Sequence, residues 1–530
     1  MKITLLPFAM EIIFLFSGIF FGSCKKTGTA TPPTVPTPVI TSFSPTSDTI
    51  GASVAISGTN FSVVASENIV KFNGTSAVVS AAADKQLTAI VPLGVTTGPI
   101  TVTVNGKTAT STNLFTPVGP SITSFTPLLS GIGYSVSIRG THFSQDLMKD
   151  IVTINGVTAE VTAATTMLLT VTVPDGATTG KISVMVKGLQ ATSDSNITIR
   201  KLVVTTLAGT GNQGSDDGPG NAASFYSPEG IVIDANNNLY ITDYANNKIR
   251  QITPDGVVST FAGTGVSGTS NGPKTNAEFA TPVGIALDKN GNFYISEGSG
   301  RNDIREISSS GIVSTIAGSP MGSAGYSDGT GSSALFSNPL GMAIGIDGNI
   351  YVVDNLNNVI RKVTPQGVVT TFAGSGTPGF NDGVGTAASF KSPGAITVDA
   401  DGNFYISDQF GSRIRKMTAS GEVTTVAGSG TVGFADGQGS EASFAGAAGI
   451  VKDQSGNLFI ADSENGLIRM VTSSGYVGTL AGTQGMSTYS SNGTGASSVI
   501  SNPFGIAEAT DGTLYVVANG SSQILKITVQ

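Results

Sequence analysis

A segment with a period of 54 to 57 residues recurs six times in the C-terminal part of the chain. Its first copy, residues 227–250, contains Pro-Glu-Gly-Ile, an apolar run, Asp, an aromatic residue, Ile, an acid and Ile-Arg. A fixed period of this size indicates a repeat architecture. The aromatic residue marks the same point of every copy, at Tyr240, Tyr294, Tyr351, Tyr405, Phe459 and Tyr515, which lie 54, 57, 54, 54 and 56 residues apart.

Each copy contains four short apolar runs separated by turn residues. In the first copy the runs are 230–234, 239–242, 248–253 and 257–262. Runs of this length, rich in Val, Ile, Tyr and Phe and bounded by Gly, Asn and Asp, predict an antiparallel meander of four strands. Such a sheet has two faces to bury, and stacking six sheets radially buries both, which predicts a six-bladed β-propeller.

The two ends of the repeat region predict how the ring closes. Residues 201–209 match the fourth strand of each repeat, such as 368–374, whereas the last copy ends after its third strand, 523–529. We expect the N-terminal strand to complete the last blade and leave no open sheet edge. The propeller then spans residues 201–530.

The recurring Pro-x-Gly-Ile, Asp-x-x-Gly-Asn-x-Tyr-Ile, Asp and Ile-Arg series resembles the NHL repeat, and the resemblance covers residues 201–530. It implies a propeller. It does not select a function, because the family includes a lyase, sensor domains and protein- or RNA-binding modules.

A second internal repeat precedes the propeller. Ile-Thr-Ser-Phe-Ser-Pro at 40–45 returns as Ile-Thr-Ser-Phe-Thr-Pro at 122–127, and Val-Lys-Phe-Asn-Gly at 70–74 returns as Val-Thr-Ile-Asn-Gly at 152–156. Alternating short strands in units of this size predict two β-sandwiches. These motifs resemble IPT/TIG domains, which are Ig-like spacers or adhesion modules, at 39–117 and 120–199. Residues 117–120 predict a hinge, and the direct run from 199 into 201 predicts a stiff joint.

Residues 1–23 have the pattern of a targeting segment, and Gly22-Ser23-Cys24 resembles a bacterial lipoprotein signal with a lipidated cysteine. The alternatives are an ordinary secretory signal or an uncleaved anchor. Cys24 is the only cysteine, so no disulfide forms within the chain. Residues 24–38 are a Pro/Thr-rich tether that extends roughly 40 Å. The expected location is the bacterial cell envelope, with the protein on an outer-membrane lipid anchor facing the periplasm or the surface.

The charge balance argues against a nucleic-acid partner. The chain has 27 basic and 35 acidic residues, a net charge of −8, whereas nucleic-acid binding needs concentrated Lys and Arg. Its single histidine, His142, falls in the second sandwich and is expected to decorate a turn. The composition therefore offers no His-based zinc site and no Ser-His-Asp triad. NHL-like lyases hold a metal with histidines in the central channel, and residues 201–530 contain none.

An acid and a base recur in the middle of the repeats, about seven residues apart. We interpret them as structural ion pairs, because the planar guanidinium of arginine holds a carboxylate with two hydrogen bonds. The alternative is a ring that binds a polar ligand in the channel. The acids are Asp243, Glu297, Asp354, Asp408 and Asp462, and the bases are Arg250, Arg305, Arg361, Arg415 and Arg469, with Lys526 and Ala518-Asn519 in the sixth copy.

The long loops between blades are the predicted binding surface, since loops of ~15 residues in a domain are often functional. Phe225, Phe279, Phe336, Phe390 and Phe444 end these loops and are predicted wedges between blades. Tyr326, Phe380, Phe434 and Tyr489 precede Gly-containing turns and are predicted either to stack on a ligand or to fold into the loop. Asp216, Asp217, Asp328, Asp382 and Asp436 are candidate Ca²⁺ ligands or turn formers.

The sequence therefore predicts a lipid-anchored protein that binds a glycan or a partner protein through the long-loop rim, without a cofactor other than a possible Ca²⁺. One alternative is a propeller lyase or hydrolase that uses acids and a metal, favoured by three or more acids clustered unevenly in the channel. Another is an adhesin that acts through the two sandwiches.

Overall fold

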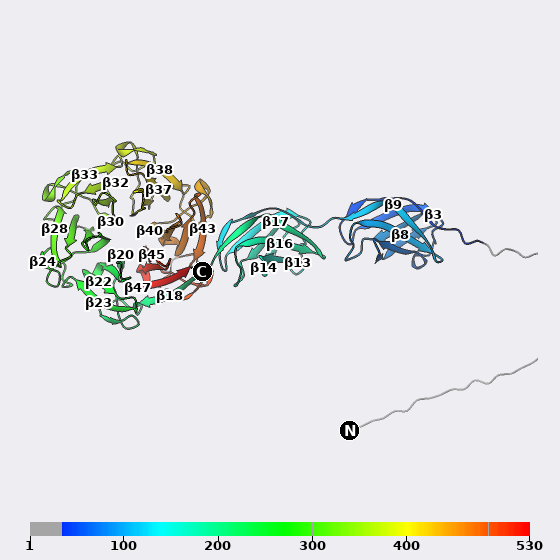
Figure 1. Cartoon of the computed structure of the whole chain (residues 1–530), viewed down its shortest axis with the longest axis horizontal. Helices are drawn as coiled ribbons and strands as arrows, with labels where there is room; N and C mark the ends of the chain where they lie inside the picture. Colours follow the sequence, from blue (N-terminus) through cyan, green and yellow to red (C-terminus); the bar gives the residue numbers. More distant parts are fainter. Residues whose placement is uncertain (1–33, 299, 486, 530) are drawn as a thin grey trace, which may run out of the picture. The chain divides into compact units, whose positions relative to one another are not determined.

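The computed structural model describes residues 34–298, 300–485 and 487–529, and its regular secondary structure is almost entirely β-strand (Figure 1). The predicted targeting segment, Cys24 and most of the tether lie outside the described residues. The chain divides into two units between Pro117 and Val118. Short 3-10 helices also occur: η1 (Ala65–Glu67), η2 (Tyr244–Asn246), η3 (Gly331–Ser333), η4 (Gly385–Ala387), η5 (Gly439–Glu441), η6 (Ser463–Asn465), η7 (Gly495–Ser497) and η8 (Asn519–Ser521).

The first unit is a sandwich of two sheets. Side chains alternate between its core and its surface, as the period of two requires, and Phe72 and Phe115 meet edge to face in the core with ring centroids 4.9 Å apart. One sheet has the order β1 (Val39–Ser44), β3 (Ser53–Thr59), β7 (Gln86–Ile90), β6 (Val79–Ala83), and the other has the order β2 (Ser47–Asp48), β9 (Lys107–Pro117), β8 (Gly98–Val104), β4 (Ile69–Phe72), β5 (Thr75–Ala77).

The second unit begins with a sandwich of the same plan, in which one long strand, β14 (Val157–Ala164), pairs with both β13 (Asp150–Ile154) and β15 (Leu168–Thr172). The two layers therefore form one continuous sheet, whereas β5 and β6 are separate in the first sandwich. The order is β10 (Ser121–Thr126), β12 (Ser135–Thr141), β15 (Leu168–Thr172), β14 (Val157–Ala164), β13 (Asp150–Ile154), β16 (Gly180–Val186), β17 (Leu189–Arg200), β11 (Leu129–Gly131). His142 is exposed in a turn after β12, with a positive φ of 58°.

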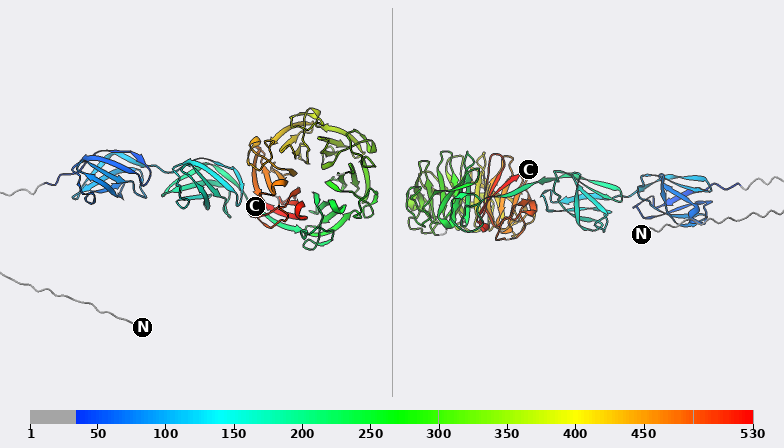
Figure 2. Two further views of the ribbon diagram at one scale, coloured as in Figure 1. Left: turned by 180° about the vertical axis from the view of Figure 1, so that it is seen from behind. Right: turned by 90° about the horizontal axis from the view of Figure 1, so that it is seen from below.

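Six blades follow, arranged in a ring around a central axis (Figures 1 and 2). Each sheet has five strands instead of the predicted four, because the long loop adds a two-residue strand outside the fourth. Blade 1 consists of β20 (Pro228–Ile233), β21 (Leu239–Asp243), β22 (Lys248–Ile252), β23 (Val257–Ala262) and, at the outer edge, β19 (Gly218–Pro219). Gly218 has φ 134°, a conformation that favours glycine.

The next four blades repeat this order. They are blade 2, β25 (Pro282–Leu287), β26 (Phe293–Glu297), β27 (Asp303–Ile307), β28 (Ile312–Gly318), β24 (Gly272–Pro273); blade 3, β30 (Pro339–Ile344), β31 (Ile350–Asp354), β32 (Val359–Val363), β33 (Val368–Ala373), β29 (Gly329–Thr330); blade 4, β35 (Ala395–Val398), β36 (Phe404–Asp408), β37 (Arg413–Met417), β38 (Glu422–Ala427), β34 (Gly383–Val384); blade 5, β40 (Ala447–Lys452), β41 (Leu458–Asp462), β42 (Leu467–Val471), β43 (Tyr476–Ala481), β39 (Gly437–Gln438).

Blade 6 closes the ring as the sequence predicts. It combines β45 (Pro503–Glu508), β46 (Leu514–Ala518), β47 (Gln523–Val529) and β44 (Gly493–Thr494) with β18 (Leu202–Ala208), which comes from the start of the propeller. β18 pairs antiparallel with β47, with Val204 opposite Ile527. The first and last segments of the propeller are therefore hydrogen-bonded in one sheet, and the closure prediction is confirmed.

Neighbouring blades approach closely at the axis because small residues lie on the innermost strands. A Cβ on Gly230 would collide with the carbonyl oxygen of Val283 in the next blade. The Thr242 hydroxyl accepts a hydrogen bond from the Gly230 amide and donates one to that same carbonyl, both at 2.7 Å. The predicted wedges are fully buried between the blades, which fits their recurrence at the end of each loop.

The second sandwich packs directly against blades 5 and 6. Leu129 of β11 is buried in the same apolar cluster as Leu480 of β43, and the Leu128 amide donates to the Tyr476 hydroxyl at 2.6 Å. A Cβ on Gly478 would lie 2.7 Å from Leu129 Cγ, so glycine provides the space for this contact. The Ala496 amide also donates to the Ile132 carbonyl at 2.9 Å. Sandwich and propeller are thus held by a packed interface as well as by the short connection between β17 and β18.

Candidate ligand-binding rim

One rim of the propeller is formed by the long loops together with the turns between the second and third strands of each blade. Loop and turn are tied to each other: Asn246 in the blade 1 turn donates to the Gly214 carbonyl at 2.7 Å, and Asn357 in blade 3 donates to the Gly325 carbonyl at 2.8 Å. Each of these bonds joins a turn to a loop residue that lies 32 positions earlier in the sequence. The rim is therefore a connected surface, and its loops are fixed at both ends.

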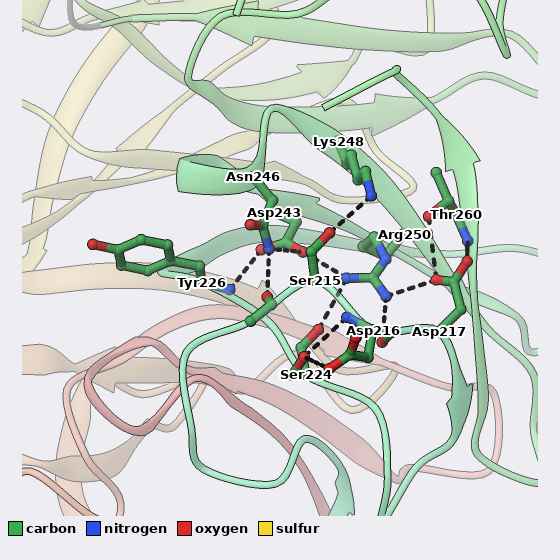
Figure 3. A network of polar contacts seen from close by, with 11 residues as sticks. Ser215, Asp216, Asp217, Ser224, Tyr226, Asp243, Asn246, Lys248, Arg250 and Thr260 are labelled. Atoms are coloured by element: carbon green, nitrogen blue, oxygen red, sulfur yellow. Dashed lines mark hydrogen bonds and ion pairs between the residues drawn. The ribbon is translucent and has the colours of Figure 1, made fainter. Parts of the chain in front are cut away.

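Below this rim, each of blades 1 to 5 contains a buried arginine that holds the loop in place, and Figure 3 shows this network in blade 1. In blade 1, Arg250 Nη1 donates to Asp243 Oδ2 at 2.7 Å and to the Ser224 carbonyl at 3.0 Å. Its Nη2 donates to Asp217 Oδ1 at 2.7 Å and to the Asp216 carbonyl at 2.8 Å. The guanidinium also lies 5.1 Å from the centre of the Phe225 ring. One side chain thus joins the blade, the wedge and the long loop.

The network recurs with similar geometry in four further blades, and the structure brings each predicted acid next to its predicted arginine. All five arginines and their strand acids are fully buried. The distances are 3.1 Å for Arg305 to Glu297, 2.8 Å for Arg361 to Asp354, 3.3 Å for Arg415 to Asp408 and 2.8 Å for Arg469 to Asp462. These acids lie inside the blades and not in the channel, so the alternative of an acidic ring facing a channel ligand is not what the structure shows.

Burial and pairing act in opposite directions on these carboxyls. Burial raises the pKa of Asp408 to about 6, although the Lys391 amide and Arg415 favour its charged form. The same burial raises the pKa of Asp243, Asp354 and Asp462 above the usual range. A buried ion pair therefore costs solvation that its hydrogen bonds must offset.

The sequence missed the second acceptor of each arginine, which comes from the long loop. It is Asp217, Asn271, Asp328, Asp382 or Asp436, at 2.7 to 2.8 Å from the arginine. In blade 4 the other face of Asp382 accepts hydrogen bonds from the Thr425 amide and hydroxyl at 3.2 and 2.9 Å. Burial alone would raise the pKa of Asp382, but these bonds outweigh it and hold the pKa below its usual range. The three aspartates predicted at the rim, Asp328, Asp382 and Asp436, thus have a bracing contact inside the loop.

The sixth blade departs from the pattern that the sequence indicates. Strand register places Leu525, opposite Val516, in the position of the arginines, whereas Lys526 pairs with Tyr515 one residue further on. Leu525 and Ala518 are fully buried, so an apolar contact replaces the ion pair. The prediction that Lys526 takes the arginine position is therefore wrong: Ile249-Arg250 corresponds to Ile524-Leu525, and the positive charge lies one residue further on.

Aromatic side chains project from the rim on one side of the ring. Tyr326, Phe380 and Phe434, which occupy the same position in three successive loops, are 49%, 55% and 50% exposed. The Arg413 guanidinium lies 4.2 Å from the centre of the Phe380 ring, and the Tyr326 hydroxyl accepts a hydrogen bond from Thr371 at 3.3 Å. Two exposed side chains of the neighbouring turns, Leu356 and Phe410, extend this surface over blades 3 to 5.

Tyr489 is also exposed but does not share this position. The Thr206 amide donates to Asn492 Oδ1 at 2.8 Å, as the Thr425 amide does to Asp382, so Asn492 corresponds to Asp382. Ser490 then corresponds to Phe380, and its hydroxyl lies 2.8 Å from that of Ser521. The aromatic in the sixth loop is one residue earlier than the pattern predicts.

The axial channel has a different character from the rim. Its narrow upper part, a cavity of about 90 Å³, is lined by apolar side chains and glycine, with Glu229 as the one ionisable group. Burial raises the pKa of Glu229 to about 8. Across residues 34–298, 300–485 and 487–529, no three His, Cys, Asp or Glu side chains are grouped as metal ligands. No helix among the described residues is long and apolar enough to cross a membrane.

Comparison with protein families identifies the modules of the chain. Residues 38–117 and 120–200 match the IPT/TIG domain, and residues 225–252 match the NHL repeat. The chain therefore contains two IPT/TIG domains and, in blade 1 of the propeller, an NHL repeat, in agreement with the all-β architecture.

Three relatives illustrate how far the similarity extends. The chloroplastic protein SUPPRESSOR OF QUENCHING 1 of Arabidopsis thaliana is 30% identical over 290 residues, 51% of this chain and 27% of the relative. Teneurin-3 of Mus musculus is 30% identical over 38% of this chain, and NHL repeat-containing protein 2 of Bos taurus is 26% identical over 49% of it. The chain spans 27%, 8% and 41% of the length of these relatives.

Among solved structures, a protein of unknown function from Bacteroides thetaiotaomicron is 22% identical with a TM-score of 0.49, covering 78% of this chain and 98% of the other. An auxiliary nutrient binding protein from the same species is 19% identical with a TM-score of 0.47, at the same coverage.

Proposed function

We propose that this protein is a non-catalytic binding protein that holds a carbohydrate on the aromatic side of its long-loop rim. The observation that carries the proposal is the half-exposure of Tyr326, Phe380 and Phe434 at one position of three successive loops. An aromatic ring offers a large contact surface, and polar or positively polarised groups stack well on its face. Large apolar side chains that project from otherwise braced loops mark a binding surface.

The rigidity of the loops supports a binding role. Each of the three loops that carry these rings is held by three hydrogen bonds from a buried arginine, so its aromatic ring is positioned before a ligand arrives. Preorganisation of this kind reduces the entropic cost of binding. The ring of Phe380 is further held over Arg413.

The chemistry around the rings favours a carbohydrate over a protein. The loop residues that flank them are mainly Gly, Ser, Thr and Asn, as in the segment 374–390. Neutral hydroxyl and amide groups beside an aromatic face suit a ligand with many hydroxyl groups. A protein partner would be expected to bury a larger and more continuous apolar surface.

The test is a glycan-array screen of residues 24–530, with and without Ca²⁺, comparing the wild-type chain with the variant Phe380→Ala/Phe434→Ala. A specific glycan that binds the wild type and is lost in the variant is the expected result. Ile346→Ala is the matched control, because Ile346 is also an exposed apolar residue, in the turn between β30 and β31 at the other end of the blades. If no glycan on the array binds and a surface pull-down recovers a protein, the ligand of the rim is a protein and the carbohydrate proposal is wrong.

We further propose that Cys24 carries a lipid that attaches the protein to the bacterial cell envelope. The support is the apolar segment that ends in Gly22-Ser23-Cys24 and the Pro/Thr-rich residues that follow it. Cys24→Ser is expected to release the protein from the membrane fraction and to abolish incorporation of labelled fatty acid. Continued labelling of the variant would disprove the anchor.

A further inference from the structure

The axial channel is built by the innermost strands, and one carboxyl group breaks its apolar character. Glu229 of blade 1 occupies a position that is Val283, Leu340, Gly394, Ala448 or Phe504 in the other blades. Blade 4, which contributes Gly394, lies across the ring from blade 1. Glu229 is therefore the one acidic residue of an otherwise apolar lining.

Glu229 has no partner that neutralises it. Burial is the only cause that shifts its pKa, to about 8, and no hydrogen bond to its carboxyl group occurs among the described residues. The polar side chain next to it in the mouth, Asn519, donates to the Pro228 carbonyl at 2.9 Å. A carboxyl group in an apolar channel is costly to ionise unless a positive group comes to it.

A second carboxyl group lies at the other end of the same channel. A ring that includes Ile231, Ile285 and Met342 lines both the upper cavity and a lower one of about 310 Å³, so the two cavities adjoin at this ring. Glu508 is the one charged residue lining the lower cavity. Burial, with Asp453 and Asp511 nearby, raises its pKa to about 7.

The charge at this lower end is not balanced by the lysine in the corresponding position of blade 5. Lys452 turns to Asp399, with 2.7 Å between Nζ and Oδ2, and to the Tyr405 hydroxyl at 3.1 Å. The channel therefore has a carboxyl at each end and an apolar constriction between them. The two glutamates lie four positions apart along equivalent strands, which corresponds to ~13 Å along the strand direction.

We propose that the axial channel binds a linear aliphatic diamine, with one ammonium group at Glu229, the methylene chain through the isoleucine-lined constriction and the second ammonium at Glu508. An ammonium group supplies the positive charge and the hydrogen-bond donors that each carboxyl lacks. An unbranched chain of methylene groups matches a narrow apolar passage. This site is separate from the carbohydrate surface on the rim.

Titration calorimetry of residues 24–530 with 1,8-diaminooctane tests the proposal. The expected result is binding that weakens at least tenfold in Glu229→Gln and in Glu508→Gln. 1-Aminooctane has a single ammonium group, so it is expected to bind more weakly, and 1,4-diaminobutane is expected not to reach both carboxyls. Glu306→Gln is the matched control, because Glu306 is a partly buried acid of the propeller that does not line the channel.

A variant that changes no charge separates channel occupancy from general electrostatic attraction. Ala448→Phe introduces at blade 5 the residue that blade 6 carries as Phe504, and it is expected to block the channel and abolish binding. A cooperative thermal unfolding transition in each variant establishes that it is folded. Absence of binding at millimolar diamine, or equal affinity of the wild type, Glu229→Gln and Ala448→Phe, would overturn the proposal.

Discussion

Replacing Arg415 by leucine is expected to destabilise the propeller by about 4 kcal/mol, because removal of one partner of a buried ion pair costs about 3–5 kcal/mol. Arg415 is fully buried and donates to Asp408, Asp382 and two backbone carbonyls. The substitution leaves the Asp408 carboxylate in an apolar blade without its cation. Asp382 suffers less, because it is half exposed and water can replace the lost bond.

The sixth blade shows how the loss can be repaired. It has Ala518 and Leu525 at the positions of Asp408 and Arg415. The double variant Asp408→Ala/Arg415→Leu removes the stranded carboxylate and is therefore expected to recover about 2 kcal/mol relative to Arg415→Leu. The two substitutions are coupled, so the losses of stability in the two single variants must add up to more than the loss in the double variant.

Thermal unfolding followed by circular dichroism measures the effect, at roughly 2 °C of Tm for each kcal/mol in a domain of this size. We expect a decrease of about 8 °C for the single variant and about 4 °C for the double variant. Lys416→Leu is the matched control: it removes a positive charge next to Arg415, and loss of that charge alone is expected to change Tm by no more than about 1 °C. An unchanged Tm in Arg415→Leu, or a double variant less stable than the single one, would refute the bracing role of the arginine.

Three further perturbations test other parts of the architecture. Deletion of residues 201–208 removes the strand that closes blade 6 and should lower Tm by more than about 10 °C; an unchanged Tm would contradict closure by this strand. Leu129→Asp places a charge in the interface between the second sandwich and the propeller, so hydrogen exchange at the Ala496 amide should accelerate while exchange in the blade cores stays slow; unaltered exchange at Ala496 would mean that the interface does not depend on this contact. The pKa of Glu229 is raised to about 8, so its contribution to the free energy of unfolding is fully present below the unfolded-state pKa of ~4.3 and is lost as the pH rises through 8. Glu229→Gln should remove that decrease, and an identical pH profile in wild type and variant would show that the carboxyl is not buried in solution.

Features that repeat along the chain were determined by the sequence itself. The period of the Tyr240 series predicted the blades, and the position of residues 201–209 predicted the closing strand, because both are encoded by short patterns within one chain. The partnership of Asp243 and Arg250 was also foreseeable, since adjacent antiparallel strands bring residues on either side of a tight turn together. The predicted binding loops are confirmed as loops, whereas their ligand remains a prediction.

Contacts between distant segments were decided only by the tertiary structure. The second acceptor of each arginine comes from a loop 33 or 34 residues away, and the added strand of each blade comes from the same loop. The burial of Leu129 against Leu480 depends on where the sandwich meets the ring. Glu229 reads as an ordinary polar residue between Pro228 and Gly230, and only the closed ring surrounds it with apolar walls. The physical reason is the same in each case: a side chain's solvation depends on neighbours that the fold brings together, and local periodicity does not specify them.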